Sequence, residues 1–333
     1  MKQPLRFAEA VCAGHPDRLS DTIADRIVAL AVERDSCSLV GVEIALHRDV
    51  VFVDGRIACG NGHPAVDESE IEEIVRKTFS DAGYGIELLA SPDGEDEPAE
   101  VGFRPDPKEL KIRFDLCISG LDPDERAIRG IADDQVIGVG HACRGERAGL
   151  IPLEQALARD FVRALDGFRG APLPRLLGPD GKALVVVRGR SLFAVSLSIQ
   201  HVEDAEWIGL VEKVRSACLA VASEYVTAGE LEPPDASVSW LFNGAGAFSI
   251  GGPHGDNGLS GKKLVAEAYG SAVPIGGGTI HGKDPHKPDV RAQRIARERA
   301  VALVRGGVEE ATVWVVFRPG DEEPAWVEEE VLR

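Results

Sequence analysis

The chain has 333 residues with 44% hydrophobic content, which is enough apolar material for two or three domains with real cores. Its 55 Asp and Glu residues outnumber its 37 Lys and Arg residues, and the formal net charge of −18 argues against nucleic-acid binding, which needs a basic face. We expect no membrane span and no secretory signal, and the six cysteines lack metal-ligand spacing, which predicts free thiols in a reducing cytoplasm.

The first third of the chain combines helical and strand patterns. In order, it predicts a helix at 17–33, strands at 40–46 and 50–58, a helix at 68–79, an acidic proline-punctuated loop at 91–100 and a strand at 111–118. The strands at 40–46 and 50–58 flank a short polar turn, so we expect them to form a hairpin.

The remaining chain continues in the same way. It predicts a helix at 153–165, strands at 183–187 and 192–199, a helix at 205–223, a strand at 237–242, a short helix at 261–268, a helix at 290–304 and a strand at 312–317. The strands at 183–187 and 192–199 again predict a hairpin. Hairpins followed by helices predict an α/β fold of the α+β type, with helices layered on mixed or antiparallel sheets. Strict βαβ alternation is missing, which argues against a Rossmann sheet.

The sequence Gly-His-Pro-Asp at residues 14–17 opens the first predicted helix. Pro16 suits the first helical position, and the helix N-terminus offers free N–H groups and positive potential to an anion. Asp17 could hold a metal there, and His15 could donate a hydrogen bond to an oxygen that gains charge. Taken alone, these residues are explained more simply as an ordinary helix start in which Asp17 stabilises the helix dipole.

Two glycine-rich stretches, at residues 251–263 and 276–289, carry the densest chemistry. Glycines let the main chain approach a bulky anion, lysines neutralise it, and carboxylates among them suggest a divalent metal. The spacing does not match the phosphate loop of nucleoside triphosphatases. We expect Ser260 to cap a short helix ending at Gly270, with Lys262 and Lys263 in its first turn, where cations need a compensating anion. A polyphosphate is the expected occupant.

Three further positions are ambiguous by themselves. Asp134 and Asp180 each lie in a short polar sequence that a simple turn would explain. Glu43 lies at the centre of an apolar strand, and strand alternation predicts that its carboxylate points to solvent.

In this order, the motifs at 14–17, 251–263 and 276–289 resemble those of the S-adenosylmethionine synthetase (methionine adenosyltransferase) family, and the resemblance runs from about residue 7 to residue 317. It implies three similar α/β domains, with segments 1–124, 125–247 and 248–333 interleaved in space. It also implies a cytoplasmic homodimer or dimer of dimers with active sites at the subunit interface. The implied reaction is attack of the methionine sulfur on C5′ of ATP, followed by hydrolysis of the released tripolyphosphate to pyrophosphate and phosphate.

The resemblance also implies roles at matched positions. His15 would stabilise the departing oxygen, Asp17 and Asp289 would bind Mg²⁺, and Glu43 would bind K⁺, which replaces the solvent interpretation of that residue. The implied phosphate and substrate cations are Lys182, Lys262, Lys263, Lys283 and Lys287. Phe248 would stack on adenine, and the residues that would orient the substrates are Asp134, Asp180 and Asp256.

The chain departs from the family's motifs in both halves of the implied site. Arg18 replaces a lysine, Lys262 replaces an arginine, and Ala247 stands where the family has another arginine. Asp133 and Val136 replace the glycines of a Gly-Asp-Gln-Gly loop. The chain also ends at residue 333, short of the family's usual C-terminal segment.

The most informative departure is Arg56, which aligns with the family's glutamate that holds the methionine ammonium. An arginine repels an ammonium group and attracts a carboxylate. The family's gating glutamine aligns near Leu121. Three hypotheses follow: synthesis of S-adenosylmethionine from ATP and methionine, adenosyl transfer to a different small-molecule acceptor, or a non-catalytic partner subunit of a true synthetase.

Overall fold

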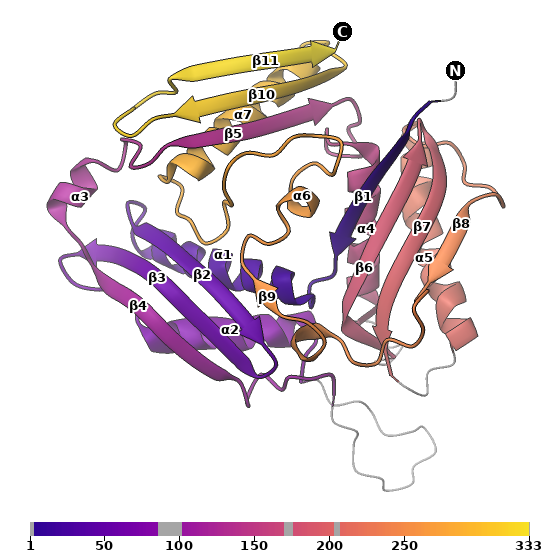
Figure 1. Cartoon of the computed structure of the whole chain (residues 1–333), viewed down its shortest axis with the longest axis horizontal. Helices are drawn as coiled ribbons and strands as arrows, with labels where there is room; N and C mark the ends of the chain where they lie inside the picture. Colours follow the sequence, from indigo (N-terminus) through magenta and orange to yellow (C-terminus); the bar gives the residue numbers. More distant parts are fainter. Residues whose placement is uncertain (1–2, 86–101, 170–175, 203–206, 333) are drawn as a thin grey trace, which may run out of the picture.

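A computed structural model describes residues 3–85, 102–169, 176–202 and 207–332. The described chain forms three sheets, each covered on one face by helices (Figure 1). The loop predicted at 91–100 and the start of the helix predicted at 205–223 lie outside the described residues. None of the helices in the described ranges combines the length and apolarity that a bilayer crossing requires.

The first sheet has the strand order β4-β3-β2-β9. Its elements are β2 (Leu39–His47), β3 (Val50–Asn61), β4 (Lys111–Leu121) and β9 (Gly258–Leu259), with helices α1 (Pro16–Arg34) and α2 (Glu68–Ala82). Strands β2 and β3 form the predicted antiparallel hairpin, whereas β4 runs parallel to β3. The apolar face of α1, with Leu19, Ile23 and Ile27 fully buried, packs into the same core as Val42 and Ile44 of β2. Helix α1 is thereby fixed across the sheet.

The second sheet has the strand order β1-β6-β7-β8. Its elements are β1 (Leu5–Val11), β6 (Leu177–Arg188), β7 (Ser191–His201) and β8 (Ser239–Phe242), with helices α4 (Leu153–Arg169) and α5 (Trp207–Thr227). The predicted β6–β7 hairpin is confirmed, and β1 pairs antiparallel with β6 from a distant part of the sequence. This pairing brings the residues just before α1 next to the start of β6.

The third sheet has the strand order β11-β10-β5 and packs against α7. Its elements are β5 (Val136–Cys143), β10 (Glu310–Phe317), β11 (Trp326–Leu332) and α7 (Pro288–Arg305). Gly138 and Gly140 of β5 allow the helix to approach closely, because a Cβ atom there would lie only 2.5 Å and 2.1 Å from main-chain carbons of Ala292 and Ala296. Short helices α3 (Pro123–Ala127), η1 (Gly252–His254) and α6 (Leu264–Glu267) complete the described elements.

The predicted class of helices on mixed or antiparallel sheets is confirmed. Four strands were not predicted, namely β1, β5, β9 and β11. Strand β11 is an edge strand with mostly exposed residues, so its sequence lacks an alternating apolar face. Strands from the first 124 residues enter two different sheets, and so do those from residues 125–247.

Candidate functional site

The N-terminus of α1 holds the most buried carboxylate of the candidate site. Asp17 is fully buried in the first turn, behind Pro16 at the start of the helix. Its Oδ1 accepts the main-chain N–H of Leu259 at 3.2 Å and lies 3.4 Å from the Lys262 ammonium. Its Oδ2 lies 3.3 Å from the Lys263 ammonium and makes no hydrogen bond to the described residues. Asp17 therefore binds the first glycine-rich stretch and does more than stabilise the helix dipole.

His15 caps the same helix, and its ring is oriented by a main-chain contact. Its Nδ1 accepts the N–H of Asp17 at 3.2 Å. Burial lowers the pKa of His15, while the charges of Asp180 and Asp17 oppose this shift. The ring is therefore neutral at neutral pH, and because Nδ1 accepts a hydrogen bond, the ring proton is on Nε2. His15 thus presents a single N–H donor.

Replacing His15 tests this donor. We expect His15→Ala to lower kcat on the order of 10²-fold, as loss of one donor to a developing negative charge does. His15→Gln should retain part of the rate, because its amide N–H can take the place of the Nε2 donor. Steady-state kinetics with ATP and methionine, the substrates that the resemblance implies, would measure both variants, with the exposed His47→Gln as the control. Equal rates for His15→Ala and the unmodified protein would contradict the role.

The first glycine-rich stretch pairs with strand β2 through β9. This pairing overturns the prediction that Ser260 caps a helix. Ser260 does not cap a helix: its hydroxyl accepts the N–H of Ile44 at 3.0 Å and donates to Glu43 at 2.5 Å. Helix α6 is a single turn that begins after Lys263, with no side-chain cap. The prediction of a capped helix from Gly261 to Gly270 with two lysines in its first turn is wrong, because the Ser260 hydroxyl is hydrogen-bonded to residues of β2. The lysines lie in the loop, beside Asp17.

The second glycine-rich stretch also contacts strand β2 through its main chain. Lys283 forms an isolated β-bridge with Gly41, and its ammonium lies 3.0 Å from Oδ2 of Asp289 in the first turn of α7. Lys287 occupies the N-cap position of α7 without a side-chain capping bond, and its ammonium lies 2.6 Å from Asp133. Both carboxylates thus carry a lysine partner from the same stretch.

The other predicted residues fall at several places. Asp180 is buried and accepts the Gly252 N–H at 2.8 Å. Lys182 lies 2.6 Å from Glu9 across the β1–β6 pair. The main chain of Phe248 bonds to His201 in both directions. The exposed carboxylates of Asp134 and Asp256 each accept the N–H of the following residue.

These contacts define two groups of predicted residues. The first surrounds the start of α1 and comprises His15, Asp17, Lys262 and Lys263, with Asp180 and Lys182 close enough to influence the charge of His15. The second is the Lys283–Asp289 pair with its neighbour Lys287. Phe248, Asp134 and Asp256 make their described contacts elsewhere.

Asp17 and Asp289 are the candidate Mg²⁺ ligands among the residues of these two groups. The buried Oδ2 of Asp17 has no hydrogen-bond partner among the described residues, and lysines neutralise both Asp17 and Asp289. In the described ranges, no group of three or more His, Cys, Asp and Glu side chains is arranged to hold a metal by itself. Mg²⁺ is commonly held by one or two carboxylates together with substrate phosphates, so isolated aspartates fit this ion. Glu43 offers an exposed carboxylate beside Ser260.

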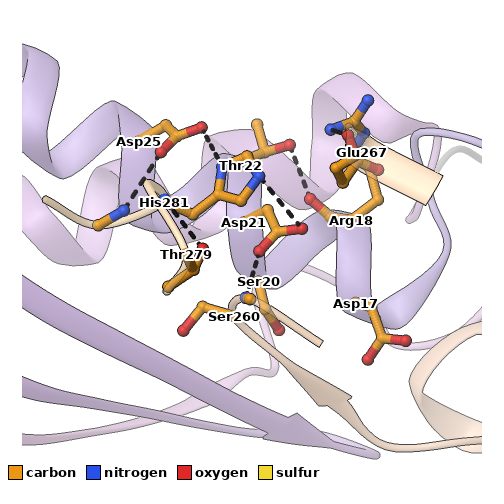
Figure 2. Close-up of polar contacts among 12 residues, drawn as sticks. Asp17, Arg18, Ser20, Asp21, Thr22, Asp25, Ser260, Glu267, Thr279 and His281 are labelled. Atoms are coloured by element: carbon orange, nitrogen blue, oxygen red, sulfur yellow. Dashed lines mark hydrogen bonds and ion pairs between the residues drawn. The ribbon is translucent and has the colours of Figure 1, made fainter. Parts of the chain in front are cut away.

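The sequence analysis assigned no role to Asp21 and Asp25 of α1 or to His281 of the second glycine-rich stretch. Asp21 contacts the first stretch, and Asp25 contacts His281 (Figure 2). A signal was present, because Asp17, Asp21 and Asp25 recur every four residues and must share one face of α1. The identity of their partners, more than 230 positions away, had no sequence signal.

The two arginines at departures from the family motifs are both ion-paired. Arg56 on β3 makes two contacts with Glu125 of α3, at 2.8 and 2.9 Å. The hydrogen bond that Arg56 donates to Glu125 raises the pKa of Arg56 and lowers the pKa of Glu125. Arg18 lies 2.6 Å from Glu267.

Comparisons with known proteins agree with these motifs. Family models described as S-adenosylmethionine synthetase, N-terminal domain and C-terminal domain match residues 4–91 and 250–331. An S-adenosylmethionine synthase from Deinococcus deserti is 32% identical over 95% of this chain and 80% of its own length. One from Thermus thermophilus is 33% identical over 90% of this chain and 75% of its own length.

The fold is also found in a solved structure. An unusual S-adenosylmethionine synthetase from Campylobacter jejuni superimposes with a TM-score of 0.78 at 23% identity. The match covers 98% of this chain and 81% of that chain. At this identity the likeness describes the fold alone.

Proposed function

The chain belongs to the S-adenosylmethionine synthetase family, and we propose that it is a methionine adenosyltransferase that makes S-adenosylmethionine from ATP and methionine. The observation that best supports this from the structure is the buried Asp17 between Lys262 and Lys263, next to the oriented donor of His15. Such an arrangement suits a leaving group with several negative charges, because the stabilising charges are in place before the reaction.

The reaction forms one bond and breaks one. The methionine sulfur attacks C5′ of ATP with its lone pair, and the bond from C5′ to the triphosphate oxygen breaks, so that tripolyphosphate leaves. The Nε2–H of His15 would donate to that departing oxygen. Ammonium groups of Lys182, Lys262, Lys263, Lys283 and Lys287 would neutralise phosphate oxygens.

We further propose that Asp17 and Asp289 each bind Mg²⁺, which would neutralise phosphate charge and orient the chain of phosphates. Glu43 would bind K⁺. Phe248 would stack on adenine, while Asp134, Asp180 and Asp256 would orient the substrates. The lysines now paired with Asp17 and Asp289 would turn from carboxylate to phosphate when the nucleotide and metal enter.

A homodimer or dimer of dimers, in the cytoplasm, is part of this proposal. Apolar side chains are exposed on strands of all three sheets, as expected of surfaces that pair with a second copy. They include Phe7, Phe52, Ile137, Leu184, Phe193, Leu241 and Trp326.

The function is tested by incubating the purified protein with ATP, methionine, Mg²⁺ and K⁺, and detecting S-adenosylmethionine by mass. Because water would then hydrolyse the released tripolyphosphate, pyrophosphate and phosphate should appear in equal amounts with it. Turnover of ATP only with another thioether or acid would replace methionine as the acceptor. Failure to bind ATP or tripolyphosphate, together with association with an active synthetase, would identify a partner subunit instead.

A different acceptor is the second candidate, because of Arg56 and its partner Glu125. The double variant Arg56→Glu, Glu125→Gln removes the cation and avoids two facing carboxylates. We expect it to lower the KM for methionine severalfold if an ammonium group binds near Arg56, since a carboxylate attracts it. The control is the double variant Arg104→Glu, Glu109→Gln, which alters an exposed ion pair elsewhere in the same way. An unchanged or raised KM would show that Arg56 does not face the acceptor.

A further inference from the structure

Helix α1 presents three carboxylates on one face to the two glycine-rich stretches (Figure 2). Beyond Asp17, the carboxylate of Asp21 accepts the main-chain N–H of Gly261 at 2.7 Å. One turn later, Asp25 accepts the N–H of Gly282 at 3.3 Å. Each of these glycines directly precedes a lysine of the proposed phosphate site, Lys262 or Lys283. The two carboxylates therefore hold the main chain at the point from which each lysine extends.

His281 connects the two carboxylates. Its Nδ1 lies 2.8 Å from Asp25 and its Nε2 lies 3.8 Å from Asp21, while its main-chain N–H donates to Thr279 at 3.1 Å. The ring is largely buried, at 12% exposure. Asp21 is almost fully buried, and its Oδ2 has no hydrogen-bond partner among the described residues. The charge of the His281 ring favours the ionised form of Asp21 more than the charge of Arg18 does.

The two glycine-rich stretches pack so tightly here that neither can shift easily relative to the other or to β2. A Cβ atom at Gly261 would lie 2.8 Å from Cβ of Thr279 in the other stretch. At Gly282 it would lie 2.1 Å from the carbonyl oxygen of Val42, and both glycines have positive φ. The spacing between the stretches is thus set by direct contact with each other, with β2 and with α1.

We propose that Asp21, Asp25 and His281 form a clamp on α1 that positions the two phosphate-binding stretches at one fixed spacing. They are positioning residues: their side chains end on the main chain of the stretches and on one another, and they act through Lys262 and Lys283. The proposal rests on the proposed function for what the lysines bind. The clamp itself is defined by contacts that need no substrate.

The charge state of His281 makes the clamp sensitive to pH. Burial lowers the pKa of His281, but the hydrogen bond to Asp25 and the charges of Asp21, Asp25 and Glu267 outweigh it, so the net shift is upward. Burial raises the pKa of Asp21 to about 6, with Glu267 adding to the rise and His281, the Gly261 N–H and Arg18 opposing it. As pH rises through the raised pKa of His281, the ring loses its charge, and the carboxylates of Asp21 and Asp25 lose the positive charge that both contact. The clamp should then weaken on the alkaline side.

Hydrogen exchange of main-chain N–H groups, measured on the full chain without ATP, tests the clamp. Asp21→Ala should reduce the protection factor around Gly261, and Asp25→Ala that around Gly282, each roughly tenfold and each at its own stretch. Asp25→Asn, which keeps an acceptor oxygen, should restore part of the protection. His281→Asn should keep a donor to Asp25 but abolish the alkaline loss of protection. The control is His286→Asn, in the same stretch, because the ring of His286 contacts the main-chain carbonyl of Ser36 and neither carboxylate of the clamp.

The kinetic counterpart is the KM for ATP, which should rise with pH in the unmodified protein and become independent of pH in His281→Asn. Unchanged protection at both stretches in the alanine variants would overturn the clamp, and so would a uniform loss throughout the fold. If Asp21→Ala does not fold, the variants of His281 and of the half-exposed Asp25 still decide the outcome. An inactive protein with the expected exchange pattern would refute the proposed function only, whereas an active one without that pattern would refute the clamp only.

Discussion

Asp17→Asn is expected to reduce the rate of S-adenosylmethionine formation on the order of 10²–10³-fold while the protein remains folded. The carboxylate is fully buried between two ammonium groups, and its Oδ2 has no hydrogen-bond partner in the described chain. Asparagine keeps the shape and an acceptor for the Leu259 N–H but removes the charge that a divalent cation needs. Asp17→Asn should therefore lower the turnover number and weaken the dependence of the rate on Mg²⁺ concentration.

The measurement is steady-state kinetics over a range of Mg²⁺ concentrations, with circular dichroism to confirm the fold. Glu68→Gln is the matched control, because Glu68 is an exposed carboxylate in the first turn of α2 and serves only the helix start. If Asp17→Asn loses no more activity than Glu68→Gln, Asp17 merely stabilises the dipole of α1.

Lys283→Ala should lower kcat on the order of 10²-fold or more and weaken tripolyphosphate binding, since a preorganised cation at the leaving group is lost. The variant also leaves Asp289 without its ammonium partner at 3.0 Å, adding an unneutralised carboxylate near the phosphates. Lys283→Arg should recover part of the binding but less of the rate, because a planar fork replaces a compact charge.

Rates and tripolyphosphate affinity would be measured together, with Lys77→Ala as the control, since Lys77 is an exposed lysine paired with Asp81 on α2. The double variant Asp17→Asn, Lys283→Ala adds a sharper criterion. If both stretches act on one polyphosphate, the double loss should be much smaller than the product of the single losses. Fully multiplicative losses would indicate that Asp17 and Lys283 contribute independently and do not act as one unit.

Most helices and both hairpins could be predicted because their signals are local. Periodicity over a few turns places Leu19, Ile23 and Ile27 on one face of α1, and that face is indeed buried. Strand β1 was missed because its partner β6 lies about 170 positions away and the strand itself is short. Strand β5 was missed because its glycines break the apolar pattern, and their purpose becomes visible only when α7 packs on them.

The candidate site divides in the same way. The glycine-rich stretches, the lysines and the start of α1 could be predicted because their residue types alone suit a polyanion. The partner of Ser260 could not be predicted, because its hydroxyl bonds to the edge of β2, which is distant in sequence, and not to the start of a helix. Asp21 and Asp25 could not be assigned either, because an acidic helix face is usually a solvated one.

By itself, then, the amino-acid sequence determined the helix and strand periods, the family motifs and the types of residue in the site. The tertiary structure decided which groups meet: Asp17 with two lysines, Asp21 and Asp25 with the glycines before Lys262 and Lys283, and Arg56 with Glu125. The physical reason is that a side chain's intrinsic chemistry is local, whereas its pairing and burial depend on long-range packing of three sheets built from distant parts of the chain.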